Sequence, residues 1–390
     1  MTSTNVARCT GRLVALILLF CGLSSRAHSQ PVAPVTPQIV TPTQGDHTLR
    51  GVAGKRVLIG CALATVDLQD PIAALVTNQF NCITPEYEFM PEKLIDDKGN
   101  FTFEQGDKIV AFAEQHHIPV LGHMLVWHFV TRKWFFEDAD GKPLPRDKAL
   151  ANLKTYITGV VGHYKGRIKA WNVVNEGLSD NDGEYLRDTP AFKAIGEDYI
   201  AKAFEFAHQA DPNAELYYND YNIEQPTKLE KTLKLVRSLQ AQGVKLDAVG
   251  IQGHWLLNWP PTEMIENGIE ALAQTGVKVM ITELDVDPLP RDVTGADMAT
   301  VEKGANPYPN GLPATVQTQL ASRYSAIMTA ILKHPSVTLI GFWGTHDGRS
   351  WLNDFPVKGR TNYPLLFDRQ YQPKPAFESV VKALQAAPQQ

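Results

Sequence analysis

The chain contains the run Val277-Lys278-Val279-Met280-Ile281-Thr282-Glu283, in which apolar and β-branched residues give way to two polar residues. A second run, Val337-Thr338-Leu339-Ile340-Gly341-Phe342, has the same character and is followed by Trp343. Runs that are apolar on both faces are typical of strands in parallel sheets that helices cover on each side. Both runs therefore predict buried strands of a parallel sheet.

Eight segments of this kind alternate with longer, helix-like stretches. They cover residues 57–63, 82–86, 120–126, 170–175, 215–219, 248–252, 278–283 and 339–343. The alternation predicts βα units, and eight units predict an α/β fold, a single-domain (β/α)8 TIM barrel, over residues 48–390. An open doubly wound sheet is the alternative, but the first strand lacks the glycine pattern of dinucleotide-binding folds.

The stretch between the fourth and fifth strands predicts one long helix. Thr189 can cap it and Pro190 can take its first position, while Asp211-Pro212 would end it. Apolar residues recur every three to four positions along it and form one face. They are Phe192, Ile195, Tyr199, Ala203 and Phe206.

Residues 1–29 have the features of a signal peptide. Arg8 and Arg12 precede an apolar run over residues 13–20, and Ala27-His28-Ser29 offers a small-residue cleavage site. The run is too short to span a bilayer comfortably, which disfavours the alternative of a retained anchor. Residues 30–47 form a Pro/Thr-rich linker. We expect a secreted protein, extracellular or periplasmic, with no stable membrane insertion.

The composition is that of a folded and mildly acidic protein. Hydrophobic residues make up 44% of the 390 residues, which suffices for a large core. With 37 Lys and Arg against 42 Asp and Glu, the net charge of -5 gives no reason to expect a nucleic-acid partner. Cys61 and Cys82 lie in strand-like segments, where buried thiols are expected rather than a disulfide.

Polar residues follow seven of the eight predicted strands. In a parallel barrel the carboxyl ends of all strands face one mouth, so these residues are expected to share a site. In strand order they are Thr84-Pro85-Glu86, His123 to His128, Asn175-Glu176, Asn219-Asp220, Gln252-Gly253-His254, Thr282-Glu283 and Trp343.

Glu176 and Glu283 directly follow the fourth and seventh strands. Glycosidic cleavage needs such a pair, with one carboxyl group protonated to assist the leaving oxygen and the other ionised to attack the anomeric carbon. His254 could be the donor that keeps one of them ionised. The structural alternative for each glutamate is a salt bridge to a Lys or Arg of the barrel.

Tryptophans at strand ends favour a sugar ligand, because an indole face can stack on a pyranose ring. Trp127, Trp343 and Trp351 occupy such positions, whereas Trp171 lies within the fourth strand and is expected in the core. Trp255 and Trp259 flank a predicted exposed loop, where they would extend the cleft or pack on the loop itself.

Other classes of function explain these residues less well. A metal hydrolase could use His116, His117, His123 and His128, but the chain has no His-Glu-x-x-His motif, and no metal or cofactor is expected. The Gly-x-Ser-x-Gly motif of serine hydrolases is also absent from the sequence. A catalytically silent carbohydrate-binding barrel remains the non-enzyme alternative, although it has no need of two strand-end glutamates.

The chain resembles the endo-β-1,4-xylanases of glycoside hydrolase family 10 from about residue 49 to 383. Seven motifs in the same order carry the resemblance. They are Phe80-Asn81-x-Ile83-Thr84-Pro85-Glu86, Gly122-His123-x-Leu125-Val126-Trp127-His128, Trp171-x-Val173-Val174-Asn175-Glu176, Leu216-Tyr217-Tyr218-Asn219-Asp220-Tyr221-Asn222, Gly250-Ile251-Gln252-Gly253-His254, Ile281-Thr282-Glu283-Leu284-Asp285, and Trp343-Gly344 with Asp347 and Ser350-Trp351.

The resemblance implies a retaining xylanase that hydrolyses internal bonds of xylan by a double displacement, as a monomer without a cofactor. Glu176 would be the acid/base and Glu283 the nucleophile, while Asn175 would hold the 2-hydroxyl of the sugar. His254 would orient the nucleophile. The other expected subsite residues are Glu86, His123, Trp127, Gln252, Trp343 and Trp351.

The sequence departs from the family pattern mainly on the glycone side. The family usually continues Thr-Pro-Glu with Asn-x-x-Lys, and both residues contact the glycone sugar one subsite from the cleavage point; here they are Tyr87 and Met90. Val130, Leu121 and Asn172 replace a usual Gln, Arg and acidic residue. These changes predict altered glycone-side recognition, and they leave open an alternative substrate, a decorated or different β-glycan.

The segment over residues 284–313 contains five prolines and little periodicity. Loops of this length without secondary structure are uncommon in compact domains unless they have a function. We expect this one to border the leaving-group side of the cleft without contributing catalytic groups.

Overall fold

The computed structural model describes residues 47–290 and 306–388. Within them, nine strands form one sheet. They are β1 (Leu58–Leu63), β2 (Cys82–Pro85), β3 (Val120–Val126), β4 (Ile168–Asn175), β5 (Glu215–Asp220), β6 (Ala248–Ile251), β7 (His254–Leu256), β8 (Lys278–Asp287) and β9 (Val337–Phe342).

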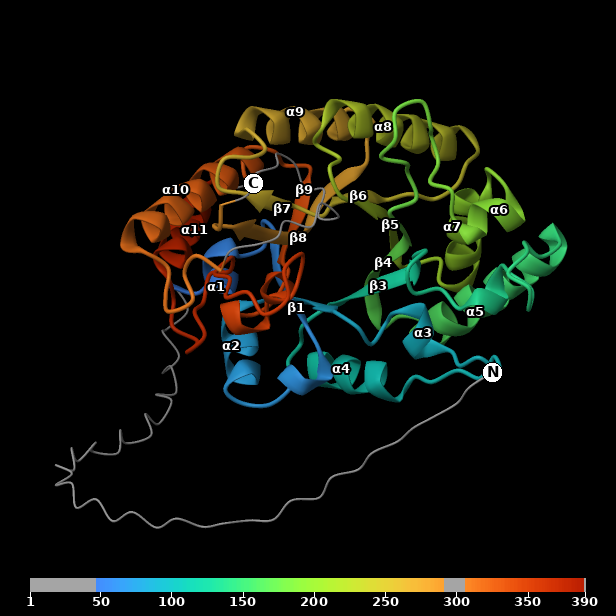
Figure 1. Ribbon diagram of the computed structural model, residues 1–390, viewed down its shortest axis with the longest axis horizontal. Helices are drawn as coiled ribbons and strands as arrows, with labels where there is room; N and C mark the ends of the chain where they lie inside the picture. The colour runs from blue at the N-terminus through green and yellow to red at the C-terminus, as the bar shows by residue number, and fades with distance from the viewer. Residues whose placement is uncertain (1–46, 291–305, 389–390) are drawn as a thin grey trace, which may run out of the picture. The chain divides into compact units, whose positions relative to one another are not determined.

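Eight of these strands close into a parallel barrel. The hydrogen-bonded order β6-β5-β4-β3-β2-β1-β9-β8 is completed by pairing of β6 with β8, which joins Ala248 to Lys278 and Ile251 to Ile281. Figure 1 shows these strands at the centre with helices packed around them. The predicted (β/α)8 TIM barrel is therefore confirmed, and the carboxyl ends of the strands share one mouth.

Helices follow most of the strands. They are α1 (Leu49–Ala53), α2 (Ile72–Gln79), α3 (Pro91–Leu94), α4 (Glu104–Gln115), α5 (Arg146–His163), α6 (Pro190–Ile195), α7 (Tyr199–Ala210), α8 (Pro226–Ala241), α9 (Thr262–Ala273), α10 (Ala314–Ile331) and α11 (Pro375–Ala386). Four of them begin with proline, whose fixed φ suits the first helical position and whose missing N–H is not needed there. Short 3-10 turns are η2 (Thr65–Asp67), η3 (Lys133–Phe135), η4 (Asp347–Arg349) and η5 (Trp351–Asn353).

The barrel interior is filled by one small apolar layer. It consists of Cys82, Leu121, Ala170, Tyr217, Ala248, Met280 and Leu339, one from each of seven strands. A much larger apolar cluster, which includes the fully buried Trp171, lies between the strands and the helices. Trp171 is therefore a core residue, as predicted, and Gly122 makes room for its ring, because a Cβ there would lie 2.1 Å from it.

The prediction of one long helix between the fourth and fifth strands is wrong, because the structure has two helices there, α6 and α7. Thr189 caps α6 as predicted, with its hydroxyl accepting a hydrogen bond from the Phe192 amide at 3.1 Å. The helix then ends at Gly196, whose φ of 103° is incompatible with a right-handed helix. The apolar periodicity continues through this break, so the sequence pattern alone does not reveal it.

Two predictions for the loops are also wrong. Trp255 does not lie in an exposed loop; it is 2% exposed and belongs to β7, which pairs with the end of β8. Trp259 is half-buried. The segment predicted as a loop from residue 284 begins as strand, because β8 continues to Asp287, and residues 291–305 lie outside the described part of the chain.

Cys61 and Cys82 are buried free thiols on neighbouring strands, in agreement with the expectation. The signal peptide predicted over residues 1–29, and the linker predicted over residues 30–47 except for His47, lie outside the described residues. Within residues 47–290 and 306–388, no helix is long and apolar enough to cross a membrane.

Candidate active site

A layer of polar side chains lies directly above the apolar layer of the barrel. His123, Asn172, Asn219 and Thr282 each stand two residues beyond a member of that apolar layer and therefore point to the same side of their strands. All four are buried. Their hydrogen bonds to one another and to the residues above them make this layer the base of the candidate site.

Glu176 follows β4 and is 8% exposed. Its carboxylate accepts hydrogen bonds from the indole N–H of Trp127 at 2.8 Å, the amide of Gln252 at 3.0 Å and the amide of Asn175 at 3.2 Å. Three other predicted site residues thus surround the carboxyl group of Glu176.

Glu283 lies in β8 and is 5% exposed. Its Oε1 accepts a hydrogen bond from the Asn219 amide at 2.7 Å, and its Oε2 lies 3.1 Å from His254 Nε2. The other ring nitrogen of His254 lies 3.1 Å from Asp285 Oδ1. His123 Nε2 lies 4.0 Å from Glu283 Oε1. The predicted partner role of His254 is thus supported by geometry, with Asp285 holding the imidazole from behind.

Asn219 connects the two carboxyl groups. Its amide nitrogen donates to Glu283 and also to the side-chain oxygen of Asn175, at 2.9 Å. Asn175 in turn donates to Glu176, so two amides bridge the glutamates. Thr282 donates to Asn219 Oδ1 at 2.6 Å, which fixes the orientation of this amide.

The surroundings of the two glutamates shift their pKa values in opposite directions. Burial, followed by the negative charge of Asp220, raises the pKa of Glu176 to about 7, although the hydrogen bonds from Gln252 and Trp127 act in the opposite direction. Burial would also raise the pKa of Glu283. There, however, the hydrogen bond from His254 and the charges of the nearby histidines prevail and lower it below its ordinary value.

His254 is positioned to carry a positive charge. Burial alone would lower its pKa, but the carboxylates of Asp285 and Glu283 raise it to about 10. A protonated imidazole can donate from both nitrogens, one to each carboxylate. Glu283 is therefore held in its ionised form by a cation that is itself fixed by Asp285.

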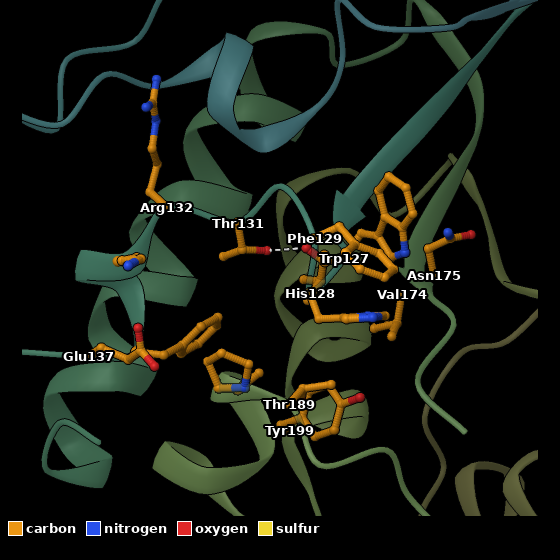
Figure 2. Close-up of a pocket in the computed structure, with 15 residues that line it drawn as sticks. Trp127, His128, Phe129, Thr131, Arg132, Glu137, Val174, Asn175, Thr189 and Tyr199 are labelled. Carbon is orange, nitrogen blue, oxygen red and sulfur yellow. Dashed lines mark hydrogen bonds between the residues drawn. The ribbon is translucent and has the colours of Figure 1, made fainter. Parts of the chain in front are cut away.

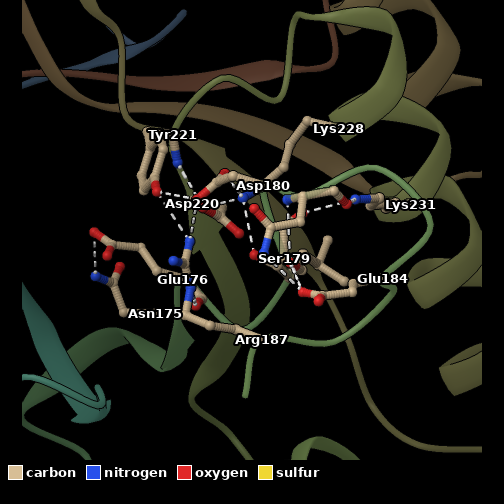
Figure 3. Close-up of polar contacts among 12 residues, drawn as sticks. Asn175, Glu176, Ser179, Asp180, Glu184, Arg187, Asp220, Tyr221, Lys228 and Lys231 are labelled. Carbon is tan, nitrogen blue, oxygen red and sulfur yellow. Dashed lines mark hydrogen bonds and ion pairs between the residues drawn. The ribbon is translucent and has the colours of Figure 1, made fainter. Parts of the chain in front are cut away.

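A polar network behind Glu176 fixes its backbone (Figure 3). Glu176 has a φ of 56°, which is unusual for a residue other than glycine. The guanidinium of Arg187 donates to the Glu176 carbonyl oxygen at 3.0 Å and to Asp180 at 2.6 Å. Lys228 pairs with Asp180 at 2.8 Å and with the buried Asp220 at 3.1 Å. The loop after β4 and the end of β5 thus together support the backbone of Glu176.

A cavity of about 350 Å³ lies beside the site on its β3 and β4 side (Figure 2). Trp127 and Asn175, which both contact Glu176, form part of its wall. His128 lines it as well, and burial lowers the pKa of this histidine to about 4. The metal site considered for His116, His117, His123 and His128 gains no support, because no group of three or more potential ligands is arranged for a metal within the described part of the chain.

Two of the remaining predicted residues, Trp343 and Trp351, lie near His254 and Asp285. The Trp343 ring centroid lies 5.1 Å from that of His123 and 6.4 Å from that of His254. Trp351 donates its indole N–H to Asp285 at 2.8 Å. Glu86 lies apart from these contacts: its carboxylate is 3.5 Å from the guanidinium of Arg349.

Two functional candidates received no individual role from the sequence. Asn219 was named among the polar residues at strand ends that are expected to share a site, but no function was assigned to it. Asp285 extends a predicted strand, so the same rule could have found it. Arg349 could not have been found in this way, because it lies in a turn well after β9. Its role depends on contacts with residues more than 250 positions away in the chain.

The residues that depart from the family pattern occupy different environments. Tyr87 is 43% exposed, and Met90 and Val130 are half-buried. Leu121 belongs to the apolar layer inside the barrel. Asn172 donates to the side-chain oxygen of Asn175 at 2.9 Å and lies 3.2 Å from His123 Nδ1, so a neutral amide holds these two site residues.

Comparison with known proteins places this arrangement among related chains. The family model for glycosyl hydrolase family 10 matches residues 48–383. Endo-1,4-beta-xylanase A of Xylanibacter ruminicola is 42% identical over 353 residues, which cover 88% of this chain and 95% of that protein.

Two solved structures show the same similarity in three dimensions. A family 10 endoxylanase retrieved from a sugarcane soil metagenome is 40% identical with a TM-score of 0.81, and the match covers 87% of this chain and 99% of that one. A second solved structure, of a mutant protein in complex with xylotriose, is 32% identical with a TM-score of 0.79, and the match covers 86% of this chain and 99% of that one.

The charge states of the two glutamates can be measured directly. We predict that the Glu176 carboxyl group titrates at about pH 7, and that Asp220→Asn lowers its pKa because a neighbouring negative charge is removed. Carboxyl-carbon NMR titration would measure both values. Asp211→Asn, a buried aspartate at the end of α7, is the matched control and should leave Glu176 unchanged. A Glu176 pKa at the ordinary value of 4.5 would contradict this account.

Proposed function

The chain belongs to glycosyl hydrolase family 10, as its motifs predict, and we propose that it is a secreted, retaining endo-1,4-β-xylanase. The observation that carries this proposal is the different surroundings of two buried carboxyl groups at one barrel mouth, which shift their pKa values in opposite directions. Glu176 keeps its proton up to about pH 7, whereas the pKa of Glu283 is lowered. Retaining glycosidases need this combination of an acid and a nucleophile.

In the first step, the ionised carboxylate of Glu283 attacks the anomeric carbon while Glu176 transfers its proton to the glycosidic oxygen. The bond between carbon and that oxygen breaks, and the leaving chain departs as an alcohol. Asn219 and His254 hold the attacking carboxylate through its two oxygens. Trp127 and Gln252 hold the carboxyl group of the acid.

In the second step, Glu176, now ionised, removes a proton from water, and the water oxygen displaces Glu283 from the anomeric carbon. Two inversions give net retention. Activity should therefore fall as the pH rises through about 7, because Glu176 then lacks its proton for the first step. It should also fall at acidic pH, once Glu283 becomes protonated below its lowered pKa.

The names of the similar proteins support xylan as the substrate, since a relative 42% identical is named endo-1,4-beta-xylanase A. Asn175, at the end of β4, would bind the 2-hydroxyl of the sugar in the cleaved subsite. Trp343, next to His123 and His254, would stack on the same sugar. Glu86 and Trp351 would line the subsites nearest the cleaved bond.

Export and domain organisation are part of the same proposal. The charged and apolar pattern of residues 1–29 supports a signal peptide, and the prolines of residues 30–47 support a linker before the catalytic barrel over residues 48–390. A secreted monomer without a cofactor would suit a polysaccharide that cannot enter the cell.

Substitution of each glutamate separates the two roles. Glu176→Ala should lower kcat/KM on xylan by about 100- to 10,000-fold. It should lower kcat/KM on an aryl xyloside with an acidic phenol by less than about tenfold, because such a leaving group needs little protonation. Glu283→Ala should abolish both activities. Glu230→Ala, at an exposed position on α8, is the control and should retain both. Equal losses on the two substrates in Glu176→Ala would rule out its role as the acid.

A decorated or different β-glycan is the second candidate substrate, and the exposed ring of Tyr87 together with Met90 favours it. Hydrolysis rates on linear xylan, arabinoxylan, glucuronoxylan and mixed-linkage glucan would distinguish the candidates. We predict faster hydrolysis of the xylans than of the glucan. A clear preference for decorated xylans would identify the second candidate, and a preference for the glucan would contradict xylan as the substrate.

A further inference from the structure

The glycone side of the site contains a positively charged residue, Arg349, that the sequence pattern does not predict. Arg349 lies in η4, after β9, whereas Glu86 follows β2 and Asp67 follows β1. Because β2, β1 and β9 are neighbours in the barrel, the three side chains meet at one edge of the mouth. The guanidinium Nη2 lies 3.5 Å from Glu86 Oε2 and 3.2 Å from Asp67 Oδ2.

Hydrogen bonds to Asp67 hold one edge of the Arg349 guanidinium, and its other edge can bind a ligand. Its Nε and Nη2 both donate to Asp67, which is 2% exposed and also accepts a hydrogen bond from the Ala64 amide at 2.8 Å. The Arg349 side chain itself is 32% exposed. A guanidinium has five N–H donors in a rigid plane, and Nη1 of Arg349 has no partner among the described residues. Two preoriented donors therefore remain for a ligand.

An aromatic residue adjoins this cluster, because Tyr87 follows Glu86 in the chain and interacts electrostatically with Arg349. Tyr87 is 43% exposed. The neighbouring Glu88 is fixed by hydrogen bonds from the Thr65 backbone amide at 2.6 Å and the Thr65 hydroxyl at 2.9 Å, which anchors this turn. An exposed ring next to fixed donors is the combination that binds a sugar, through its C–H face and its hydroxyl groups.

The local charge indicates which sugar fits. One guanidinium stands between the carboxylates of Asp67 and Glu86, so the cluster carries no excess of positive charge. A uronic acid would gain little there, and its carboxylate would be repelled by Glu86. A neutral sugar, whose hydroxyl groups can donate to Glu86 and accept from Arg349, is the better match.

We propose that Arg349 is a substrate-binding residue for the neutral sugar one subsite beyond the cleaved sugar on the glycone side, with Tyr87 stacking on that sugar. Arg349 thereby replaces the hydrogen-bond donor that the chain lacks at Met90. This inference rests on the proposed glycosidase function. It refines the prediction of altered glycone-side recognition, because the turn after β9 supplies a hydrogen-bond donor.

Two aryl glycosides test the inference, one carrying xylose and the other xylobiose on the same phenol. Arg349→Ala should lower kcat/KM for the xylobioside by roughly 10- to 100-fold, the loss expected for a hydrogen bond to a charged group. It should change kcat/KM for the xyloside by less than about threefold, which also shows that the variant is folded. Arg349→Lys, which keeps the charge, should lose less in the same direction. Arg237→Ala, an exposed arginine on α8, is the control and should change neither.

Restoring a lysine at position 90 completes the test. Met90→Lys added to Arg349→Ala should recover at least tenfold of the lost xylobioside kcat/KM without affecting the xyloside. Equal losses on both glycosides in Arg349→Ala, or no loss on either, would overturn the inference while leaving the proposed function intact. A wild-type enzyme that cleaves neither glycoside nor xylan would overturn the proposed function and the inference with it.

Discussion

Two carboxyl groups buried at one barrel mouth repel each other when both are ionised, so the site depends on keeping them in different charge states. The Asn219 amide contributes to this by donating to Glu283 and to Asn175, which donates to Glu176. Position 250 on the neighbouring strand needs a glycine to leave space for this amide, because a Cβ there would lie 2.2 Å from Asn219 Oδ1. The His254 imidazole, whose pKa Asp285 helps to raise, adds positive charge beside Glu283. Asp220 adds negative charge near Glu176.

The barrel was predictable because a buried parallel strand leaves a strong pattern in the sequence. Each predicted strand overlaps an observed one, and the runs at residues 277–283 and 337–342 lie within or beside β8 and β9. The errors in the predicted helices and strands occur where the sequence carries no such pattern. A single glycine splits α6 from α7 without changing the apolar period. β7 is only three residues long, and its pairing with β8 is a tertiary contact.

The candidate site was predictable to the extent that its residues stand at strand ends. Glu176, Glu283, His254 and Gln252 follow this rule, and the structure brings them together. The charge states were not predictable in detail, because burial is the largest influence on Glu176 and burial is a property of the fold. Arg349 was missed because its contact with Glu86 depends on the neighbouring positions of β2, β1 and β9 in the barrel. The two residues are distant in the chain, so no local sequence pattern predicts this contact.

The central claim is that Glu283 attacks the anomeric carbon while Glu176 donates a proton, so that cleavage proceeds through two inversions. The stereochemistry of the product tests this claim most directly. Proton NMR of the anomeric signals, recorded in the first minutes of hydrolysis of a β-1,4-linked xylo-oligosaccharide, reports the anomer before mutarotation. The account predicts that the β-anomer forms first. The α-anomer as the first product would contradict it, because a single displacement would then have taken place.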